Sequence, residues 1–256
     1  MAGHTRLGQN FLSDPNLLDA IVRESGVGPD DVALEIGAGE GVLTRRLAAA
    51  AGHVHTIEID RRLEGALAGV AAEPNVELHW GDAVRLDLAA LDPAPTAVIA
   101  NLPYSVATPL ILRTIEQLPT VCEWTVMVQR EIADRLRAAP GSRVYGGPTV
   151  LVQLAAEVRM ARTVDPAVFR PRPRVSSALL RMTRTGPCAA EETRRLVRGG
   201  FAHRRKSLAR SLELCEPGRI AAVRAALARL GLPDDVRAEA LGPQQFEALA
   251  REMAAR

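Results

Sequence analysis

Apolar residues through residue 139 recur in two alternating patterns, short runs typical of buried strands and longer stretches with helical spacing. The predicted strands are Asp31–Ile36, His53–Asp60, Asn75–Trp80, Ala97–Ala100 and Trp124–Gln129. The predicted helices are Asp14–Ser25, Val42–Ala50, Arg61–Ala72, Pro109–Gln117 and Glu131–Ala139. This alternation predicts a doubly wound, Rossmann-like α/β fold with a parallel sheet, whose ligands bind beyond the carboxyl ends of the strands.

The pattern changes after Thr149. Two runs, Val150–Arg159 and Val175–Met182, have a β-like pattern and predict an antiparallel edge to the sheet. Beyond Gly186 we predict only amphipathic helices: Glu191–Gly200, Arg205–Leu214, Arg219–Leu230 and Pro243–Met253. We therefore expect two domains, an α/β domain over residues 1–186 and a small all-α domain over residues 187–256.

Composition narrows the class of protein. The 256 residues are 47% apolar and 24% charged, and no segment approaches the ~20 apolar residues that a bilayer span needs, so we expect no membrane segment. The start of the chain has no apolar run of the kind found in secretion signals, and the three cysteines are odd in number and widely spaced. We expect a cytoplasmic protein with reduced thiols. No long apolar stripe is left over for a partner subunit, which favours a monomer.

The net charge of +2 hides an uneven distribution. Residues 169–212 contain eleven arginines and Lys206 against only Glu191 and Glu192, a local balance of +10. The rest of the chain must therefore carry about eight negative charges. A basic face of this kind favours a polyanionic partner such as nucleic acid.

The stretch Glu35-Ile-Gly-Ala-Gly-Glu-Gly lies between a predicted strand and a predicted helix. Gly37 and Gly39 let the backbone turn tightly and approach a ligand closely. Alone, such a loop is also compatible with an ordinary strand-to-helix turn or with a nicotinamide dehydrogenase. The acidic residues Glu35 and Glu40 suit a cationic sulfonium-amine ligand better than a pyrophosphate.

Two further acids follow the next strands. Glu58 ends the second strand, where a carboxylate can accept the hydroxyls of a ribose. Asp82, followed by Ala83, comes after the third strand, at the rim where an adenine amino group would lie. Together with the glycine loop, these acids favour S-adenosylmethionine over NAD as the cofactor.

Asn101-Leu102-Pro103-Tyr104 ends the fourth strand, beside the expected sulfonium. The exocyclic amine of a base is a weak nucleophile because its lone pair is delocalised into the ring. The Asn101 amide oxygen and the Leu102 carbonyl can accept both amine hydrogens, while Pro103 fixes the backbone and Tyr104 offers a surface for base stacking. The alternative is a simple proline turn with a packed tyrosine.

Several motifs, taken in order, resemble the rRNA adenine N6-dimethyltransferase family, which includes the KsgA and Erm enzymes. The motifs are GQNFL (8–12), EIGAGEG (35–41), IEID (57–60), GDA (81–83), NLPYSVATP (101–109) and VFRPRPRVSSALLRM (168–182). The resemblance implies that Asn10 and Leu12 line the S-adenosylmethionine pocket, that S-adenosylhomocysteine is the product, and that Phe169 stacks on the target adenine opposite Tyr104.

Three later stretches resemble the KsgA branch, at residues 130–153, 201–212 and 232–250. This implies transfer of two methyl groups to each of two adjacent adenines near the 3′ end of small-subunit rRNA, in a late pre-ribosomal particle. The alternatives are an Erm-type enzyme that modifies large-subunit rRNA and confers macrolide resistance, or an inactive docking factor. A DNA adenine methyltransferase would need a separate target-recognition domain, for which the chain has no room.

Two basic clusters are candidate RNA contacts. Arg170, Arg172 and Arg174 alternate with prolines beside Phe169, and Arg204-Arg205-Lys206 opens a predicted helix in the second domain. A solvated basic face is the alternative.

Two histidines and one tyrosine are further candidates for a functional role. We interpret His53 and His55 as structural and expect no metal, because neither a cysteine nor a carboxylate lies at metal-ligand spacing. Tyr145, in a predicted loop, either contacts RNA or packs within the loop.

Overall fold

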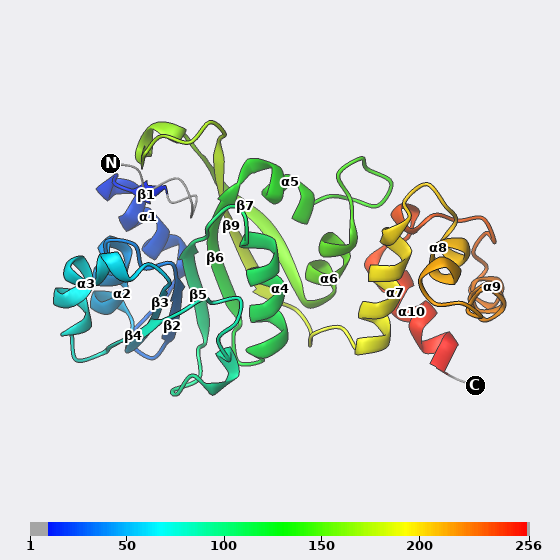
Figure 1. The fold of residues 1–256 in the computed structure, drawn as a ribbon, viewed down its shortest axis with the longest axis horizontal. Helices are drawn as coiled ribbons and strands as arrows, with labels where there is room; N and C mark the ends of the chain where they lie inside the picture. The colour runs from blue at the N-terminus through cyan, green and yellow to red at the C-terminus, as the bar shows by residue number, and fades with distance from the viewer. Residues whose placement is uncertain (1–9, 255–256) are drawn as a thin grey trace. The chain divides into compact units, whose positions relative to one another are not determined.

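The computed structural model describes residues 10–254, and its larger sheet has seven strands in the order β4-β3-β2-β5-β6-β9-β7 (Figure 1). The parallel strands are β2 (Val32–Ile36), β3 (His53–Glu58), β4 (Val76–Trp80), β5 (Ala97–Asn101) and β6 (Glu123–Gln129). β9 (Ser177–Arg184) pairs antiparallel with β6, opposite residues Glu123 to Gln129. The α/β fold and its antiparallel edge are thus confirmed. The carboxyl ends of β2 to β5 come together at one edge of the sheet.

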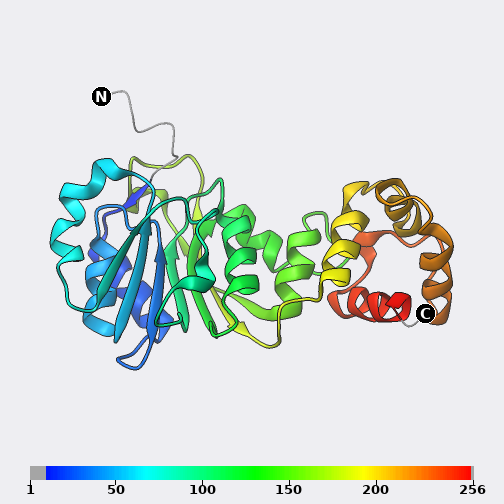
Figure 2. The same cartoon turned by 60° about the horizontal axis from the view of Figure 1, so that its bottom comes forward.

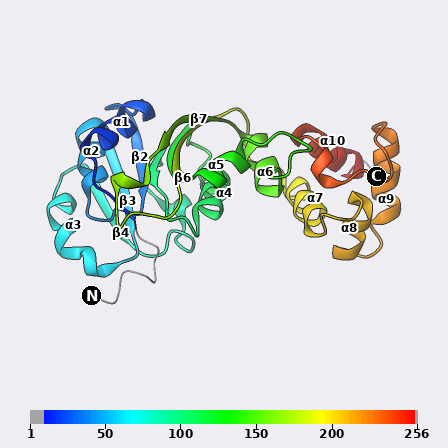
Figure 3. The same ribbon diagram turned by 90° about the horizontal axis from the view of Figure 1, so that it is seen from above.

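Helices cover both faces of this sheet (Figures 1 and 3). α1 (Pro15–Ser25) and α2 (Val42–Ala50) pack with sheet residues such as Met127 in one hydrophobic core. α4 (Ala107–Gln117) packs on the opposite face, where Trp124 Nε1 donates to Thr114 Oγ1 at 2.9 Å. Met127 and Trp124 point to opposite faces because side chains alternate along a strand. Further helices are α3 (Glu64–Ala71) and α5 (Arg130–Leu136).

The prediction of a strand over Val150–Arg159 is wrong in its first half. Residues Gly147–Ala155 form α6, and β7 covers Ala156–Val164. Pro148 lies in the first helical turn, where its missing N–H costs nothing, and the Thr149 side chain accepts from the backbone N–H of Gly146 at 3.2 Å. These start signals favour a helix, although the apolar run itself is compatible with either a helix or a strand.

A second, two-stranded sheet was not predicted. β1 (Phe11–Leu12) pairs antiparallel with β8 (Phe169–Arg170), so that Leu12 lies opposite Phe169. The pairing joins the beginning of the described chain to the proline-rich segment that precedes β9.

The remaining helices form a second compact unit of residues Asp134–Ala156 and Thr185–Arg256. They are α7 (Glu191–Ala202), α8 (Leu208–Cys215), α9 (Ile220–Arg229) and α10 (Pro243–Ala254), drawn from yellow to red in Figure 2. This unit differs from the expected domain, because α6 and the loop before it belong to it instead of to the α/β unit. Tyr145 and Val150 are fully buried in its core, and the Tyr145 hydroxyl donates to the Leu241 carbonyl at 2.9 Å.

Tyr145 therefore packs within its unit, as the second of its two interpretations predicts. Its burial raises the pKa of its hydroxyl to about 12. None of the helices within residues 10–254 has the length and apolar character needed to cross a membrane.

Candidate active site

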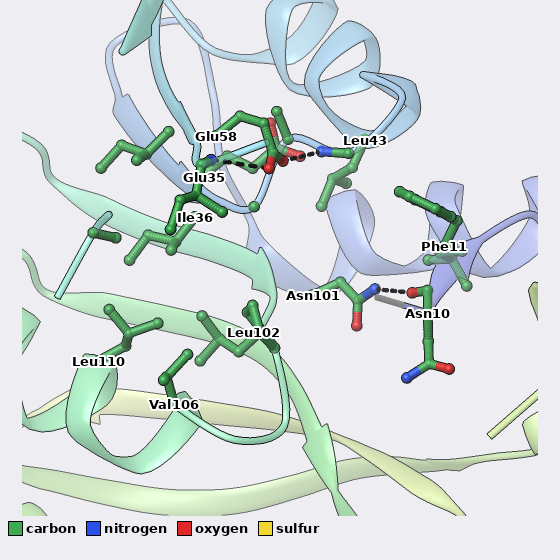
Figure 4. Close-up of a pocket in the computed structure, with 18 of the residues that line it drawn as sticks. Asn10, Phe11, Glu35, Ile36, Leu43, Glu58, Asn101, Leu102, Val106 and Leu110 are labelled. Atoms are coloured by element: carbon green, nitrogen blue, oxygen red, sulfur yellow. Dashed lines mark hydrogen bonds between the residues drawn. The ribbon is translucent and has the colours of Figure 1, made fainter. Parts of the chain in front are cut away.

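A cavity of about 260 Å³ lies at the carboxyl ends of β2, β3, β4 and β5 (Figure 4). Every residue predicted to bind the cofactor lines it: Asn10, Leu12, Gly37, Gly39, Glu58, Asp82, Ala83 and Asn101. Its walls also include apolar side chains that the sequence analysis did not single out: Leu18, Ile36, Leu43, Val106 and Leu110. The cavity thus combines an apolar body with a few polar groups, which is typical of cofactor sites.

The glycine loop is held in shape by the neighbouring strand. The backbone N–H groups of Gly37 and Ala38 both donate to the Ile57 carbonyl, at 2.8 and 3.2 Å. Gly37 and Gly39 have φ angles of +88° and +57°, which residues with a side chain rarely adopt. A Cβ at Gly39 would also lie 3.1 Å from the Phe11 ring. The loop therefore needs glycine both for its conformation and for its close approach to β1.

Glu58 is buried and bonded to three backbone N–H groups. Its Oε2 accepts from Gly39 at 2.8 Å, and its Oε1 accepts from Ile59 and Asp60 at 2.9 and 2.8 Å. These bonds compensate the carboxylate for its burial and tie it to the glycine loop. A carboxylate offers about four lone-pair directions, so Glu58 can still accept from a ligand hydroxyl.

Glu35, which was predicted together with Glu40 to favour a cationic ligand, is a second buried acid in the cavity wall. Its Oε2 accepts from Thr44 Oγ1 at 2.6 Å and from Thr56 Oγ1 at 2.7 Å. Burial nevertheless raises the pKa of Glu35 to about 8, and the charge of Glu58 adds to the effect. A protonated Glu35 limits the negative charge in the cavity.

Asp82 lies at the rim of the cavity with a partly exposed carboxylate. Its Oδ1 accepts from the backbone N–H of Val84 at 2.9 Å, which fixes the side chain in a short turn after β4. The guanidinium of Arg85 lies 3.8 Å from the other oxygen and is itself almost fully exposed. Asp82 therefore keeps a carboxylate oxygen available at the cavity rim.

Asn101 ends β5, and its amide Nδ2 donates to the Asn10 carbonyl at 3.1 Å. Figure 4 shows the amide oxygen of Asn101 pointing away from Asn10. Leu102 is buried, and its backbone N–H donates to the Met127 carbonyl at 3.1 Å, so the backbone after the strand is anchored to β6. Pro103 follows and also lines the cavity. The amide is thus oriented by a bond that the sequence did not reveal.

Tyr104 also lines the cavity, and its hydroxyl lies 2.6 Å from the Ser177 hydroxyl. Burial raises the pKa of Tyr104, although the hydrogen bond to Ser177 partly offsets the shift. Ser177 is fully buried at the first position of β9. Its place in the VSSALLRM segment, beside the aromatic and basic residues of the same motif, was the available signal for such a role.

Phe169 does not line the cavity with Tyr104. Its side chain is 2% exposed and packs in the core with Leu12 and Leu179, and it is not among the residues that line the cavity. The pairing of β8 with β1 directs the ring into the core. The stacking role that the family resemblance implies for Phe169 stays a prediction, and Phe169 lies next to the cavity residue Leu12.

The basic residues that were predicted to bind RNA differ in whether they already bind an acidic side chain of the protein. Arg172 lies 3.9 Å from Asp165, and Arg204 binds the Glu239 carboxylate at 3.1 Å and two backbone carbonyls. Four other residues predicted to contact RNA are exposed and form no ion pair within residues 10–254: Arg170, Arg174, Arg205 and Lys206. Arg204, Arg205 and Lys206 lie in the turn before α8 instead of opening the helix, because Ser207 caps its N-terminus.

The expectation that His53 and His55 have no carboxylate nearby is wrong. The register of β3 with β4 pairs His55 with Glu77, and the two oxygens of Glu77 lie 3.5 to 3.9 Å from nitrogens of three histidines. Sequence spacing missed this cluster because its members come from two strands.

Comparison with known proteins shows the family of the chain. The family model described as ribosomal RNA adenine dimethylase matches residues 1–254. The ribosomal RNA small subunit methyltransferase A of Rubrobacter xylanophilus is 44% identical over 250 residues, which cover 96% of this chain and 93% of that protein. The protein of the same name from Deinococcus radiodurans is 43% identical, with 91% and 80% covered.

Two solved structures resemble the whole chain. A dimethyladenosine transferase from Plasmodium falciparum has a TM-score of 0.74 at 25% identity, with 93% of this chain and 95% of that chain covered. The 23S rRNA methyltransferase ErmE has a TM-score of 0.68 at 28% identity, with 96% and 100% covered. The chain belongs to the ribosomal RNA adenine dimethylase family.

Proposed function

We propose that this protein transfers methyl groups from S-adenosylmethionine to N6 of two adjacent adenines near the 3′ end of small-subunit rRNA, late in subunit assembly. The observation that carries the proposal is that Asn101, Pro103 and Tyr104 line the same cavity as the glycine loop, Glu58 and Asp82. The proposed cofactor site and the proposed site for an amine-bearing base would thus be continuous. The names of the curated relatives, at 40–44% identity, support the small subunit as the source of the rRNA.

The residues of the cavity suit S-adenosylmethionine. Glu58 would accept from the ribose and Asp82 from the adenine amino group of the cofactor, while Leu12 and Ala83 provide apolar contact. When bound, the cofactor supplies an electrophilic methyl group on a sulfonium. The protein contributes by orientation, since the bonds of Glu58 and Asn101 hold both side chains in place before any ligand enters.

Asn101 would act on the target adenine through its amide oxygen. Because Nδ2 is engaged by the Asn10 carbonyl, the oxygen is the group left to accept an amine hydrogen. With the Leu102 carbonyl as a second acceptor, the nitrogen lone pair of the adenine becomes available to the methyl group. The nitrogen then carries a positive charge and loses its proton readily, so no strong base is required.

Tyr104 would provide the surface on which the adenine stacks, because its hydroxyl is already held by Ser177. Phe169 stays a predicted second stacking partner, and its ring would have to leave the core to reach the base. The exposed residues Arg170, Arg174, Arg205 and Lys206 would contact RNA phosphates.

A second candidate is methylation of large-subunit rRNA, because ErmE covers almost the whole chain. The lower identity of ErmE, 28% against 40–44% for the curated small-subunit enzymes, favours the first proposal. An inactive docking factor is disfavoured by the complete set of cavity residues.

The test is to incubate the protein with radiolabelled S-adenosylmethionine and, separately, with under-methylated small subunits, large subunits and free rRNAs, and to map modified positions by primer extension. We expect two adjacent dimethylated adenines near the 3′ end of small-subunit rRNA. The matched variants are Asn101→Ala and Asn16→Ala, since Asn16 is exposed on α1, away from the cavity lining. Asn101→Ala should lower the transfer rate by roughly 100-fold or more, and Asn16→Ala should not.

Each other outcome has a definite meaning. A label confined to large-subunit rRNA would replace the proposal with the second candidate. Binding of small subunits without any transfer would favour the docking factor. Equal loss in both asparagine variants would contradict the role assigned to Asn101.

A further inference from the structure

His53, His55 and Glu77 form a cluster on the sheet, and His79 lies against it; none of the four lines the cavity. His53 and His55 lie on one face of β3, and Glu77 and His79 lie on the same face of β4. In the parallel register His55 is opposite Glu77, so the two strands direct their imidazole and carboxylate groups to one place. These four residues are called the histidine cluster below.

The distances within the histidine cluster suit a small cation. His55 Nδ1 lies 3.0 Å from His79 Nε2 and 3.5 Å from a Glu77 oxygen. The Glu77 oxygens lie 3.7 Å from His79 Nε2 and 3.9 Å from His53 Nε2. Ligands of a tetrahedral zinc ion, with bonds of about 2.0–2.2 Å, are about 3.3–3.5 Å apart. These four separations bracket this range, and the ligand atoms of His53, His55 and Glu77 all lie within 4.8 Å of one another, so side-chain rotations would bring the groups to bonding distance.

The protonation of His55 also favours metal binding. Its Nε2 lies 2.9 Å from the Pro93 carbonyl, which can only accept, so Nε2 carries the proton. In the neutral ring, Nδ1 then presents its lone pair to the rest of the cluster. A metal-binding histidine usually has this arrangement, with its other ring nitrogen donating to a carbonyl or carboxylate.

A second, independent observation comes from His53. Its Nε2 atom is buried and has no hydrogen-bond partner within the described residues, although it faces Glu77. A buried polar atom without a partner is costly, and such atoms call for an explanation such as a bound ion. A cation between His53, His55 and Glu77 would satisfy that nitrogen and balance the charge of the carboxylate.

We infer that the histidine cluster binds one divalent transition-metal ion of the zinc type, held by imidazole nitrogens and the Glu77 carboxylate. Imidazole ligands select zinc, cobalt or nickel over magnesium or calcium, which prefer oxygen ligands. The ion would be structural. It would join β4, the edge strand of the sheet, to β3, and β4 leads directly to Gly81 and Asp82 in the cavity.

The test titrates the metal-free full-length protein with Co²⁺ alone, followed by displacement with Zn²⁺. We expect one equivalent of Co²⁺ to give the intense visible bands of a four-coordinate site, without the near-ultraviolet band of a thiolate ligand. Zn²⁺ should abolish these bands and raise the melting temperature. Dissociation constants are measured with a competing chromophoric chelator.

Matched variants separate this site from others. His53→Ala and Glu77→Gln each remove one ligand without touching the fully buried His55, and each should weaken Zn²⁺ binding by at least tenfold. His203→Ala is the control, since His203 is the only other histidine in the described chain and lies near Cys215 in the helical unit. The His203→Ala variant should bind Zn²⁺ as tightly as the unchanged protein does.

The inference is overturned by absence of stoichiometric binding, or by equal affinity in His53→Ala and the unchanged protein. In that case the cluster is a hydrogen-bonded pair of histidines, His55 and His79, with His53 packed edge-on against His55. Loss of binding only in His203→Ala would assign the metal to the helical unit. Circular dichroism of each variant without metal shows whether a loss of binding reflects misfolding.

Discussion

The cavity at the strand ends and the arginine-rich stretch of residues 169–212 were both predicted to hold ligands. Their charged groups differ in the partners that they bind within the protein. In the cavity, buried acids bond to backbone N–H groups or hydroxyls, as Glu58 and Glu35 do. In the stretch, arginines bond to acids, for example Arg194 with Glu191 at 2.6 Å and Arg195 with Glu216 at 2.9 Å. A local charge balance therefore overstates how much positive charge is free to meet RNA.

The largest effect is expected at the beginning of the stretch, where Phe169 was predicted to stack on adenine but lies in the core. Phe169→Ala should lower the free energy of unfolding by about 3–5 kcal/mol, because it removes a fully packed ring and leaves a cavity. Urea denaturation measures this, with Val175→Ala, an exposed residue of the same segment, as the control. If the free energy of unfolding falls by less than about 1 kcal/mol while methyl transfer is largely lost, Phe169 acts in the substrate site instead of in the core.

In the cavity, Glu35 should make the stability of the protein depend on pH. Its pKa is raised from 4.5 to about 8, so between these pH values the folded protein holds a proton that the unfolded chain has released. The free energy of unfolding should therefore fall as pH rises through this window, by roughly 4–5 kcal/mol in total from this group. Glu35→Gln keeps both threonine contacts and should remove this decline.

Chemical denaturation at several values from pH 5 to pH 8.5 checks the prediction. The difference in stability between Glu35→Gln and the unchanged protein should grow with pH in favour of the variant. Glu40→Gln, in the exposed part of the same loop, is the control. Parallel curves for the unchanged protein and Glu35→Gln would show that Glu35 is ionised in the fold across the whole range.

A smaller effect should distinguish free from paired basic residues. Replacing Arg205 and Lys206 by alanine should weaken binding of small-subunit rRNA by about tenfold at moderate salt and reduce the salt slope by roughly 1 to 2, because two phosphate contacts are lost. The pair Arg195→Ala and Arg198→Ala removes the same charge from arginines that already face acids, and should change the slope little. Filter binding across a salt series measures both, and equal slopes in the two double variants would contradict the distinction.

Much of the α/β unit could be predicted from the sequence because its signals are local. Each buried strand is a short apolar run, and a parallel topology forces the residues after β2, β3, β4 and β5 to one edge. For this reason Gly37, Glu58, Asp82 and Asn101 surround one cavity although 64 positions separate the first from the last.

The parts that could not be predicted depend on contacts between distant segments. α6 has an apolar pattern compatible with either a helix or a strand, and its burial among the C-terminal helices decides the outcome. The position of Phe169 follows from β1–β8 pairing, and the histidine cluster follows from β3–β4 register. No residue spacing along the chain encodes these pairings.

The smallest effect should come from the Tyr104 hydroxyl, and it tests whether the cavity uses this residue as a surface or as an acid. The hydroxyl is held by Ser177 at 2.6 Å, and its burial raises its pKa, so the phenol stays protonated at neutral pH. Tyr104→Phe removes one hydrogen bond, worth about 0.5–1.5 kcal/mol, and should slow transfer by less than about tenfold. Tyr104→Ala also removes the stacking surface, worth about 1–3 kcal/mol per base, and should slow transfer more than Tyr104→Phe does. Single-turnover rates with saturating S-adenosylmethionine separate the two variants, and a Tyr104→Phe rate as low as that of Tyr104→Ala would mean that the hydroxyl takes part in the chemistry.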